Sequence, residues 1–416
     1  MAAKGKKADK GKSVTAGKKK HTARRKGKKR KAKPAAGGRK RRGAGAVVLV
    51  TGAAGFVGSS MVEEMTDAGH AVVATDLPGS NLGAARKAGA KVVEADFTAT
   101  EDAARLFESK VDYVVHVAAL YDLSAERRDL MRVNRDGTRN VAESALDAGV
   151  KQFFYFSTGD IHGQVDGLIT EDTPPNPLNA YAESKWAGEK LLWRLHRLRN
   201  LPLTVIRPTV IYGPRCRYTA SNFFCIPGVV YAIQDRLGRD VRELPVFSDG
   251  PRISWVHVRD VTGAVRFLMG KPGAVGKAFN IADDDPMTLE EIFTLIFEAF
   301  GYKWVPARPY PTRLVAAIGR IGMNMPRFSF DLAAQFMGRN WRRVQEKLGL
   351  SEDLKPSFSR DYMSFMLGDR VFDNSRIKEA GYRFRYPDSR EGFRETFEWY
   401  RARRWLPEPG ELWGES

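Results

Sequence analysis

The sequence predicts an α/β fold: a doubly wound parallel sheet, followed by a smaller C-terminal α/β lobe and preceded by a basic tail. Three observations support this prediction. Short, almost continuously apolar runs alternate with longer stretches of helical periodicity, as in parallel sheets covered on both faces. The first apolar run, AVVLVT at 46–51, leads directly into a glycine-rich turn. The alternation loosens after about residue 213, where we expect the sheet to give way to the lobe.

The elements of the sheet domain follow one another from residue 46. After the first strand, Val57, Met61, Val62 and Met65 recur at helical spacing, and Gly69 ends the helix. Five further buried strands are expected in HAVVATD (70–76), AKVVEAD (90–96), DYVVHVAA (112–119), KQFFYFST (151–158) and LPLTVIRPTVIYG (201–213). We assign 46–215 to the sheet domain and 216–405 mostly to the lobe, with some lobe segments returning to the sheet.

The lobe is less regular, but two of its helices have clear signals. Thr288 and Glu291 form a capping box ahead of a helix with one apolar face. The segment DSREGFRETFEWYRARRWL (388–406) is typical of a last amphipathic helix. We expect 406–416 to form a C-terminal tail.

The formal charge of +19 belongs to the N-terminus. Residues 1–42 hold 20 Lys and Arg but one acid, Asp9, whereas the rest of the chain holds 48 of each sign. Residues 1–45 have few apolar side chains to bury, so we expect them to be disordered. They are interpreted as a solvated extension, since no aromatic residue is interleaved to stack on bases. The alternatives are contact with a polyanion or an acidic membrane surface and, in a eukaryotic host, nuclear import.

Several classes of protein are disfavoured by composition. Cys216 and Cys225 are the only cysteines, and their spacing predicts neither a metal site nor a disulfide framework. The N-terminus lacks the apolar core of a signal peptide. The most apolar stretch, LVAAIGRIGM at 314–323, is interrupted by Arg320 and is too short to cross a bilayer. We expect no metal, no transmembrane segment, and a cytoplasmic protein that at most lies on a membrane.

The turn TGAAGFVG (51–58) predicts a site for a dinucleotide. Gly52 permits the tight turn, Gly55 lets the backbone approach a pyrophosphate, and Gly58 allows close packing of helix on strand. The phosphates would lie over the helix N-terminus, at Phe56 and Val57, where free N–H groups favour negative charge.

An acid at the end of the next strand indicates which dinucleotide binds. Asp76 follows Gly52 by 24 residues, where a carboxylate accepts hydrogen bonds from the adenosine ribose hydroxyls. The same carboxylate would repel a 2′-phosphate, and LPGSN (77–81) offers no Arg to bind one. The sequence therefore favours NAD over NADP.

Three polar residues further along predict proton transfer. Tyr181 and Lys185 lie four apart in YAESK, on one face of an expected helix. A phenol with its unperturbed pKa of about 10 is a poor base, and a close ammonium would lower that pKa. Thr158 follows a buried strand and could donate a hydrogen bond to the reacting oxygen.

In this order, the motifs resemble those of the extended short-chain dehydrogenases/reductases, also called the NAD-dependent epimerase/dehydratase family. The resemblance covers about 46–405 and rests on TGAAGFVG, ADF (95–97), HVAA (116–119), VNRDGT (133–138), FST (156–158), YAESK, RPTVIYGP (207–214) and WVHVRDV (255–261). It implies a Rossmann-type domain, hydride transfer between nicotinamide and an alcohol or ketone carbon, and in many members a homodimer.

The resemblance also implies roles for single residues. Tyr181 would be the general acid/base, Lys185 would hold the nicotinamide ribose, and Thr158 would orient the substrate oxygen. The remaining cofactor contacts that it implies are Asp96 and Phe97 beside the adenine, Ala118 and Ala119 after the fourth strand, and Pro208 near the nicotinamide. His116 and Asn134 are interpreted as supporting residues instead.

The substrate is left open between two branches. The apolar segment YPTRLVAAIGRIGMNMPRFSF (310–330) resembles the insert of 3β-hydroxysteroid and sterol dehydrogenases, and we favour a lipophilic substrate. The alternative is a nucleotide-sugar epimerase or dehydratase, in which Arg252 would bind the diphosphate. Dehydratases carry an acid directly after the catalytic Thr, whereas Asp160 comes two places later. A second alternative, a non-catalytic NAD(P) sensor tethered by the tail, has no need of the full Thr158–Tyr181–Lys185 set.

Overall fold

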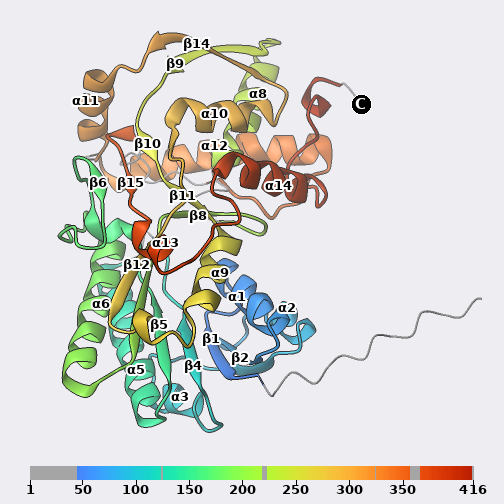
Figure 1. Cartoon of the computed structure of the whole chain (residues 1–416). Helices are drawn as coiled ribbons and strands as arrows, with labels where there is room; N and C mark the ends of the chain where they lie inside the picture. Colours follow the sequence, from blue (N-terminus) through green and yellow to red (C-terminus); the bar gives the residue numbers. More distant parts are fainter. Residues whose placement is uncertain (1–44, 123–124, 218–222, 324, 357–365, 415–416) are drawn as a thin grey trace, which may run out of the picture. The chain divides into compact units, whose positions relative to one another are not determined.

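The computed structural model describes residues 45–122, 125–217, 223–323, 325–356 and 366–414. The expectations for residues 1–42 therefore lie outside the described part of the chain. Elements are labelled as in Figure 1. Among the described residues, no helix is both long and apolar enough to span a membrane.

A seven-stranded sheet with helices on both faces forms the lower half of the view in Figure 1, below the C-terminal lobe. Its strand order is β12-β7-β5-β4-β1-β2-β3, and every neighbouring pair runs parallel. The strands are β1 (Val47–Thr51), β2 (Ala71–Asp76), β3 (Lys91–Glu94), β4 (Tyr113–His116), β5 (Gln152–Phe156), β7 (Leu203–Pro208) and β12 (Lys277–Ile281). The order reverses direction at β1, as in a doubly wound fold, and the predicted fold class is confirmed.

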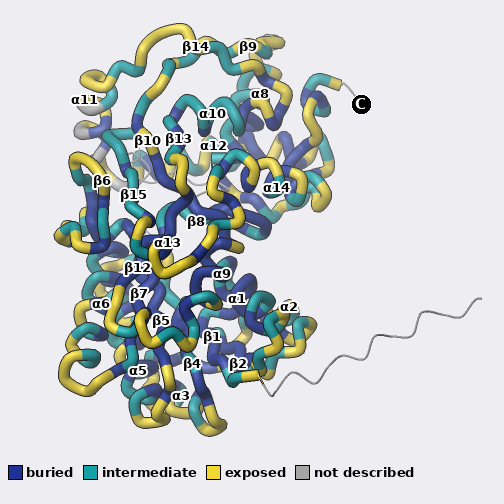
Figure 2. Tube along the Cα trace, viewed as in Figure 1, coloured by how far each residue is buried: buried dark blue, intermediate teal, exposed yellow. Residues whose placement is uncertain are grey.

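Both faces of the sheet are buried, which explains the continuous apolar runs (Figure 2). Successive side chains point to opposite faces: Val48 and Val50 pack in one core cluster, and Leu49 packs in the other. The first face is covered by α1 (Phe56–Asp67) and α9 (Val258–Leu268), and the second by α3 (Thr100–Arg105), α5 (Thr138–Asp147) and α6 (Ala180–Arg199).

The C-terminal residues build a lobe with its own core and also return to the sheet, where they supply helix α9 and one strand. Residues 277–281 supply β12, so the sheet is completed from a segment beyond 215. The lobe contains four short strand pairs: β8 (Val210–Tyr212) with β11 (Trp255–His257), β9 (Glu243–Ser248) with β14 (Lys303–Pro309), β10 (Arg252–Ile253) with β13 (Met287–Thr288), and β6 (Leu168–Ile169) with β15 (Val371–Phe372). Its main helices are α8 (Ile226–Arg236), α10 (Leu289–Glu298), α11 (Thr312–Met323), α12 (Arg327–Leu348) and α14 (Ser389–Arg401).

The two predicted lobe helices form as expected, but the C-terminal end differs. Thr288 and Glu291 make the reciprocal capping box of α10, and Asp388 caps α14. Residues 406–414, expected to be a tail, pack on the lobe instead. Leu406 and Leu412 are buried in its core, in the same cluster as apolar side chains of α14 and α8.

Candidate functional site

A cavity of about 580 Å³ lies at the carboxyl ends of the sheet strands, where doubly wound folds bind ligands. It extends from the glycine turn after β1 and the end of β2, past the loops after β4 and β5, to α6. Segments of the lobe close its far side through Ile253, Ser254, Arg370 and Phe372. One continuous space therefore connects the predicted dinucleotide turn with the predicted acid/base residues.

The glycine turn after β1 is built for close approach of backbone atoms. Gly52 has a positive φ of 70°, and a Cβ atom there would lie 2.8 Å from Ala118 Cα. A Cβ atom on Gly58 would lie 1.9 Å from the Gly52 carbonyl oxygen, so α1 packs against the turn only with glycine at this position. Gly55 is the N-cap of α1 and makes no side-chain cap, which leaves the helix N-terminus open to the cavity.

Asp76 is held at the end of β2 by backbone of the same turn. Its Oδ2 accepts a hydrogen bond from the Ala54 amide (2.9 Å), and its Oδ1 accepts one from the Leu77 amide (2.8 Å) and one from the Ser80 hydroxyl (3.2 Å). These bonds fix a carboxylate at the rim of the cavity, beside the helix N-terminus. A ligand with both a diol and a diphosphate would meet complementary groups here.

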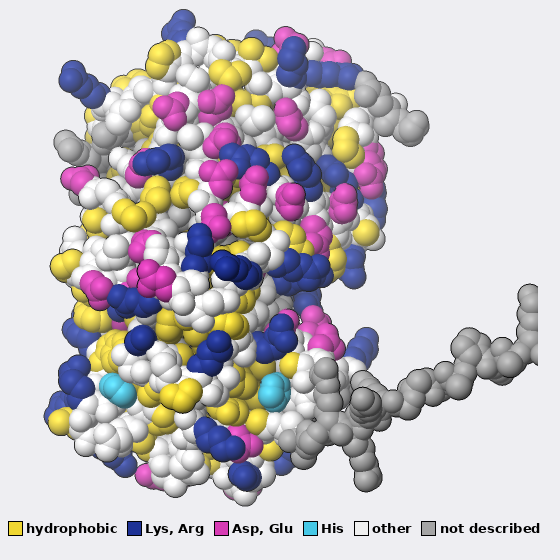
Figure 3. Space-filling model, in the orientation of Figure 1, with side chains coloured by type: hydrophobic (Ala, Val, Ile, Leu, Met, Phe, Trp, Pro, Cys, Tyr) yellow, Lys and Arg dark blue, Asp and Glu magenta, His cyan; other side chains and the backbone are white. Residues whose placement is uncertain are grey.

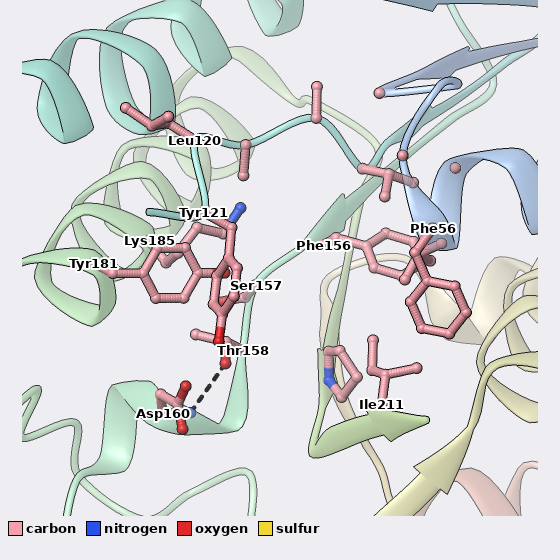
Figure 4. A pocket seen from close by; sticks show the side chains of 18 of the residues that line it. Phe56, Leu120, Tyr121, Phe156, Ser157, Thr158, Asp160, Tyr181, Lys185 and Ile211 are labelled. Carbon is pink, nitrogen blue, oxygen red and sulfur yellow. Dashed lines mark hydrogen bonds between the residues drawn. The ribbon is translucent and has the colours of Figure 1, made fainter. Parts of the chain in front are cut away.

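Tyr181, Lys185 and Thr158 all line the cavity (Figure 4). Tyr181 and Lys185 come from one face of α6, whose start is fixed by the Asn179 side chain capping the Ala182 amide. Thr158 follows β5 and caps the short η2 helix (Gly159–His162) by accepting from the Asp160 amide at 3.2 Å. The Tyr181 ring lies edge-on to that of Tyr121, with 4.8 Å between centroids.

The electrostatics differ from the sequence-based expectation. Burial raises the pKa of Tyr181, and the nearby Asp160 carboxylate raises it further. Lys185 is 1 % exposed, and burial lowers its pKa to about 7 against a smaller opposite effect of Glu189. In the protein alone the pKa of Tyr181 is therefore raised, not lowered as the sequence predicts, because burial is the largest effect and sequence spacing does not reveal burial.

Sequence reasoning missed the buried ion pair beneath Lys185. Glu189, one turn further along α6, is fully buried and accepts hydrogen bonds from Arg207 of β7 and from Trp193. The Lys185 ammonium also lies 4.5 Å from the centroid of the Tyr155 ring. The arginine within the apolar strand LTVIRP was the signal in the sequence that could have indicated a buried ion pair.

Arg252 is not brought into the cavity. It is exposed on β10, and its Nε and Nη2 both donate to Oδ2 of Asp369, at 3.0 and 2.8 Å. The cavity is instead lined by Arg370, whose Nη2 donates to Asp160 Oδ1 at 2.6 Å. No local pattern in the sequence connects these residues, which are 210 positions apart.

The other predicted cofactor residues all line the cavity: Phe56, Val57, Asp96, Phe97, Ala118, Ala119 and Pro208. The Asp96 carboxylate accepts from the amide and hydroxyl of Thr98, which fixes the loop after β3. His116 and Asn134 do not line it. His116 is buried between the hydroxyls of Thr51 (2.9 Å) and Thr138 (3.0 Å), and burial lowers its pKa to about 3.

Asn134 supports the loop after β4. Its side chain exchanges hydrogen bonds with the backbone of Leu120 (2.7 and 3.1 Å) and donates to the Ser184 hydroxyl (2.9 Å). Among the described residues, no cluster of His, Cys, Asp and Glu side chains could hold a metal ion.

The predicted apolar insert does not reach the cavity. None of the side chains described for α11 and α12 lines it, and Leu314, Ile318 and Ile321 point outward with 51 to 67 % of their surface exposed. The insert therefore gives the cavity no apolar wall.

Comparison with known proteins shows where the chain is similar to others. Residues 48–282 match the model of the NAD dependent epimerase/dehydratase family. The chain is 34% identical over 281 residues to a UDP-glucose 4-epimerase of Mycolicibacterium smegmatis, covering 64% of this chain and 86% of the relative. It is 29% identical over 271 residues to a dTDP-glucose 4,6-dehydratase of Streptomyces griseus, covering 62% and 79%.

Solved structures share the fold at lower identity. UDP-glucose 4-epimerase of Thermus thermophilus in complex with NAD superposes with a TM-score of 0.60 at 24% identity, over 85% of this chain and 99% of that one. The dTDP-glucose 4,6-dehydratase DesIV of Streptomyces venezuelae, with NAD and TYD bound, gives 0.58 at 21% identity, over 88% and 99%.

Proposed function

Because the chain belongs to the NAD dependent epimerase/dehydratase family, we propose that it is an NAD-dependent enzyme that oxidises and re-reduces a hydroxyl-bearing carbon of a nucleotide sugar. One observation carries the proposal: a single cavity joins the glycine turn and Asp76 to Thr158, Tyr181 and Lys185. The sequence alone favoured a lipophilic substrate. The curated relatives named above act on nucleotide sugars, and the apolar insert is absent from the cavity wall, so we now prefer the alternative.

The cavity fits NAD at the end that Asp76 marks. Its carboxylate would accept from the adenosine ribose hydroxyls, and the open N-terminus of α1 at Gly55 would face the pyrophosphate. Asp96 and Phe97 would flank the adenine, and Pro208 would lie near the nicotinamide. NAD supplies the acceptor and donor of hydride, which no amino-acid side chain provides.

Side chains of this protein would transfer the proton that accompanies hydride transfer. We assign the general acid/base to Tyr181, and Thr158 would hold the reacting oxygen by a hydrogen bond. Lys185, with its pKa lowered to about 7, is easily protonated at neutral pH. Anionic phosphates in the cavity would favour its ammonium form, which in turn favours the Tyr181 phenolate.

Among nucleotide-sugar reactions, the site suits epimerisation better than dehydration. Dehydration requires a base for the carbon next to the ketone and an acid for the departing hydroxyl, in addition to the first proton carrier. Of the described carboxylates that line the cavity, only Asp160 lies at the Tyr181 end, and it is paired with Arg370. Oxidation and re-reduction at one carbon need no second acid or base.

The test is product analysis with the purified protein. UDP-glucose, UDP-galactose and dTDP-glucose would each be incubated with protein and NAD, and the sugars identified by NMR. Interconversion of the two UDP-hexoses is expected, and loss of water from dTDP-glucose would favour the dehydratase instead. Turnover of a ketosteroid, with no reaction of any nucleotide sugar, would contradict the proposal and favour a lipophilic substrate.

Assembly and location are proposed from the family resemblance and the composition. We propose a homodimer that pairs through α5 and α6, a cytoplasmic location, and a solvated tail at residues 1–42. Sedimentation of the protein, with and without substitutions on α6, would test the dimer.

A further inference from the structure

Two consecutive helices of the lobe expose large apolar side chains along one face each. On α11 these recur at i, i+4 and i+7, and on α12 at i, i+4 and i+8, so each set forms a stripe. With one residue of the connection, they define the α11–α12 apolar face: Leu314, Ile318, Ile321, Met325, Phe328, Leu332 and Phe336, each 45 to 67 % exposed. Soluble monomers rarely expose so many large apolar side chains together.

The stripes are outward faces of helices that are anchored on their other side. Gly319 of α11 packs against Leu367, and Trp341 of α12 is buried in the lobe core, where its indole donates to the Leu354 carbonyl. Each helix therefore has a core-facing side of its own. The exposed apolar side chains lie on the opposite side of the helix. The exposed apolar side chains are an additional feature of two helices that each already pack on the lobe.

The segment that contains α11 and α12 has an excess of positive charge, whereas the rest of the chain from residue 43 has an excess of negative charge. Residues 312–348 hold seven Lys and Arg and two acids, whereas the rest of the chain from residue 43 holds 41 basic and 46 acidic residues. On the surface in Figure 3, which shows one side of the molecule, the two signs are mixed. The positive excess is thus concentrated where the apolar stripes lie.

Basic residues also continue the α12 stripe. Arg339 and Arg343 follow Phe336 by three and seven residues, which places them on the same helical face. Both are exposed, and no ion pair is recorded for either within the described residues. An apolar stripe bordered by arginines is the pattern of helices that lie in the interface of an anionic membrane, with guanidinium groups at the headgroups.

We propose that the α11–α12 apolar face docks on the surface of a membrane that contains anionic lipids. A second copy of the chain is a poorer occupant, because a two-fold contact through this face would set one positively charged segment against its equal. Stable attachment at a membrane surface usually combines an apolar element with a basic one. The 20 Lys and Arg of residues 1–42 supply a second basic element in the same chain.

The experiment is co-sedimentation of the full-length protein with vesicles of phosphatidylcholine alone or mixed with phosphatidylglycerol. The test variant is Ile321→Ser/Phe328→Ser/Leu332→Ser. The matched control is Leu168→Ser/Leu178→Ser/Leu237→Ser, three leucines that lie outside α5 and α6 and are 55 to 62 % exposed. Binding is measured at low salt and at about 0.5 M salt, where the Debye length of roughly 4 Å screens the tail.

We expect the natural protein and the control to bind the anionic vesicles and to keep measurable binding at high salt. The test variant should bind on the order of 100-fold more weakly at high salt, because three apolar side chains no longer enter the interface. Equal binding of the test variant and the natural protein would overturn the proposal, as would loss of all binding of the natural protein at high salt. A change from dimer to monomer in the test variant, with vesicle binding unchanged, would assign the face to a contact between copies. Turnover of a soluble nucleotide sugar should be unaffected, so this test is independent of the proposed function.

Discussion

The guanidinium of Arg370 donates to the carboxylate of Asp160 at 2.6 Å, although the two residues are 210 positions apart. Asp160 follows the sheet strand β5, and Arg370 directly precedes β15 of the lobe. The pair therefore joins the two walls of the cavity at its Tyr181 end. It also fixes the Asp160 carboxylate near Tyr181, and this carboxylate adds to the effect of burial in raising the pKa of Tyr181.

This relationship predicts a role for Arg370 in substrate binding. Arg370→Gln should raise the KM for the nucleotide sugar about tenfold or more, since one charge-assisted hydrogen bond is worth about 1.5–3 kcal/mol. NAD affinity should change little, because the predicted adenosine and pyrophosphate contacts, at Asp76 and Gly55, lie at the other end of the cavity. Arg252→Gln, on the exposed Asp369 ion pair, is the control. An equal rise in KM for both variants would remove the assignment to Arg370.

Asp76 should decide the choice of cofactor. Asp76→Asn keeps the shape of the side chain but removes the charge, so NAD should bind roughly 10- to 100-fold more weakly and NADP should gain relative to NAD. Fluorescence titration with both nucleotides measures the change. Glu94→Gln, on the neighbouring strand β3, is the matched control. An unchanged preference after Asp76→Asn would contradict the assignment.

Gly58 should be required for stability as well as for binding. The Cβ atom of Gly58→Ala would lie 1.9 Å from a carbonyl oxygen, so helix α1 must move, at a cost of about 2 kcal/mol or more. The opposite is expected for Gly338→Ala within α12, where no atom lies within 4 Å. Alanine there should stabilise the helix by about 0.5–1 kcal/mol. Thermal unfolding of both variants tests the pair of predictions, and similar Tm values would contradict the turn geometry.

Lys185 should make the stability of the protein depend on pH. Its pKa falls from 10.5 to about 7 on burial, so between these values the unfolded chain binds more protons than the folded protein. The contribution of Lys185 to the free energy of unfolding should therefore rise with pH through this window, by up to about 1.4 kcal/mol per pH unit. Lys185→Met should reduce the slope, and Lys190→Met, at an exposed position on the same helix, is the control. Urea unfolding at pH 7 and above measures the slope of the free energy of unfolding against pH. Identical slopes for the natural protein and Lys185→Met would show that the lysine is not buried as described.

The features that could be predicted from sequence are local ones. The glycine turn, Asp76 and the Tyr181–Lys185 pair are each set by spacing within one strand-turn-helix unit, and the structure brings them to one cavity. Arg370 could not be found in this way, because its place depends on the packing of β15 beside β6. Arg252 precedes a recognisable motif, but the direction of its side chain depends on Asp369, on another segment.

The predictions that were wrong concern features that depend on which side chains are buried. The effect of Lys185 on Tyr181 was inferred from charge alone, whereas desolvation dominates both groups. The apolar segment 310–330 favours a lipophilic substrate by resemblance, yet its described side chains lie outside the cavity. Hydrophobicity alone does not show whether a helix faces inward or outward. The sequence predicts a tail at 406–416, whereas residues 406–414 pack on the lobe. Two leucines in these nine residues are too weak a pattern to predict that packing.

The central claim is that NAD binds with its reactive ring beside the Tyr181 hydroxyl, and single-turnover reduction of NAD tests it most directly. Protein with bound NAD would be mixed with UDP-glucose, and the appearance of NADH absorbance followed for the natural protein and for Tyr181→Phe. The account predicts that the rate falls on the order of 100-fold or more in the variant, with NAD affinity unchanged. An equal rate in both proteins would contradict it.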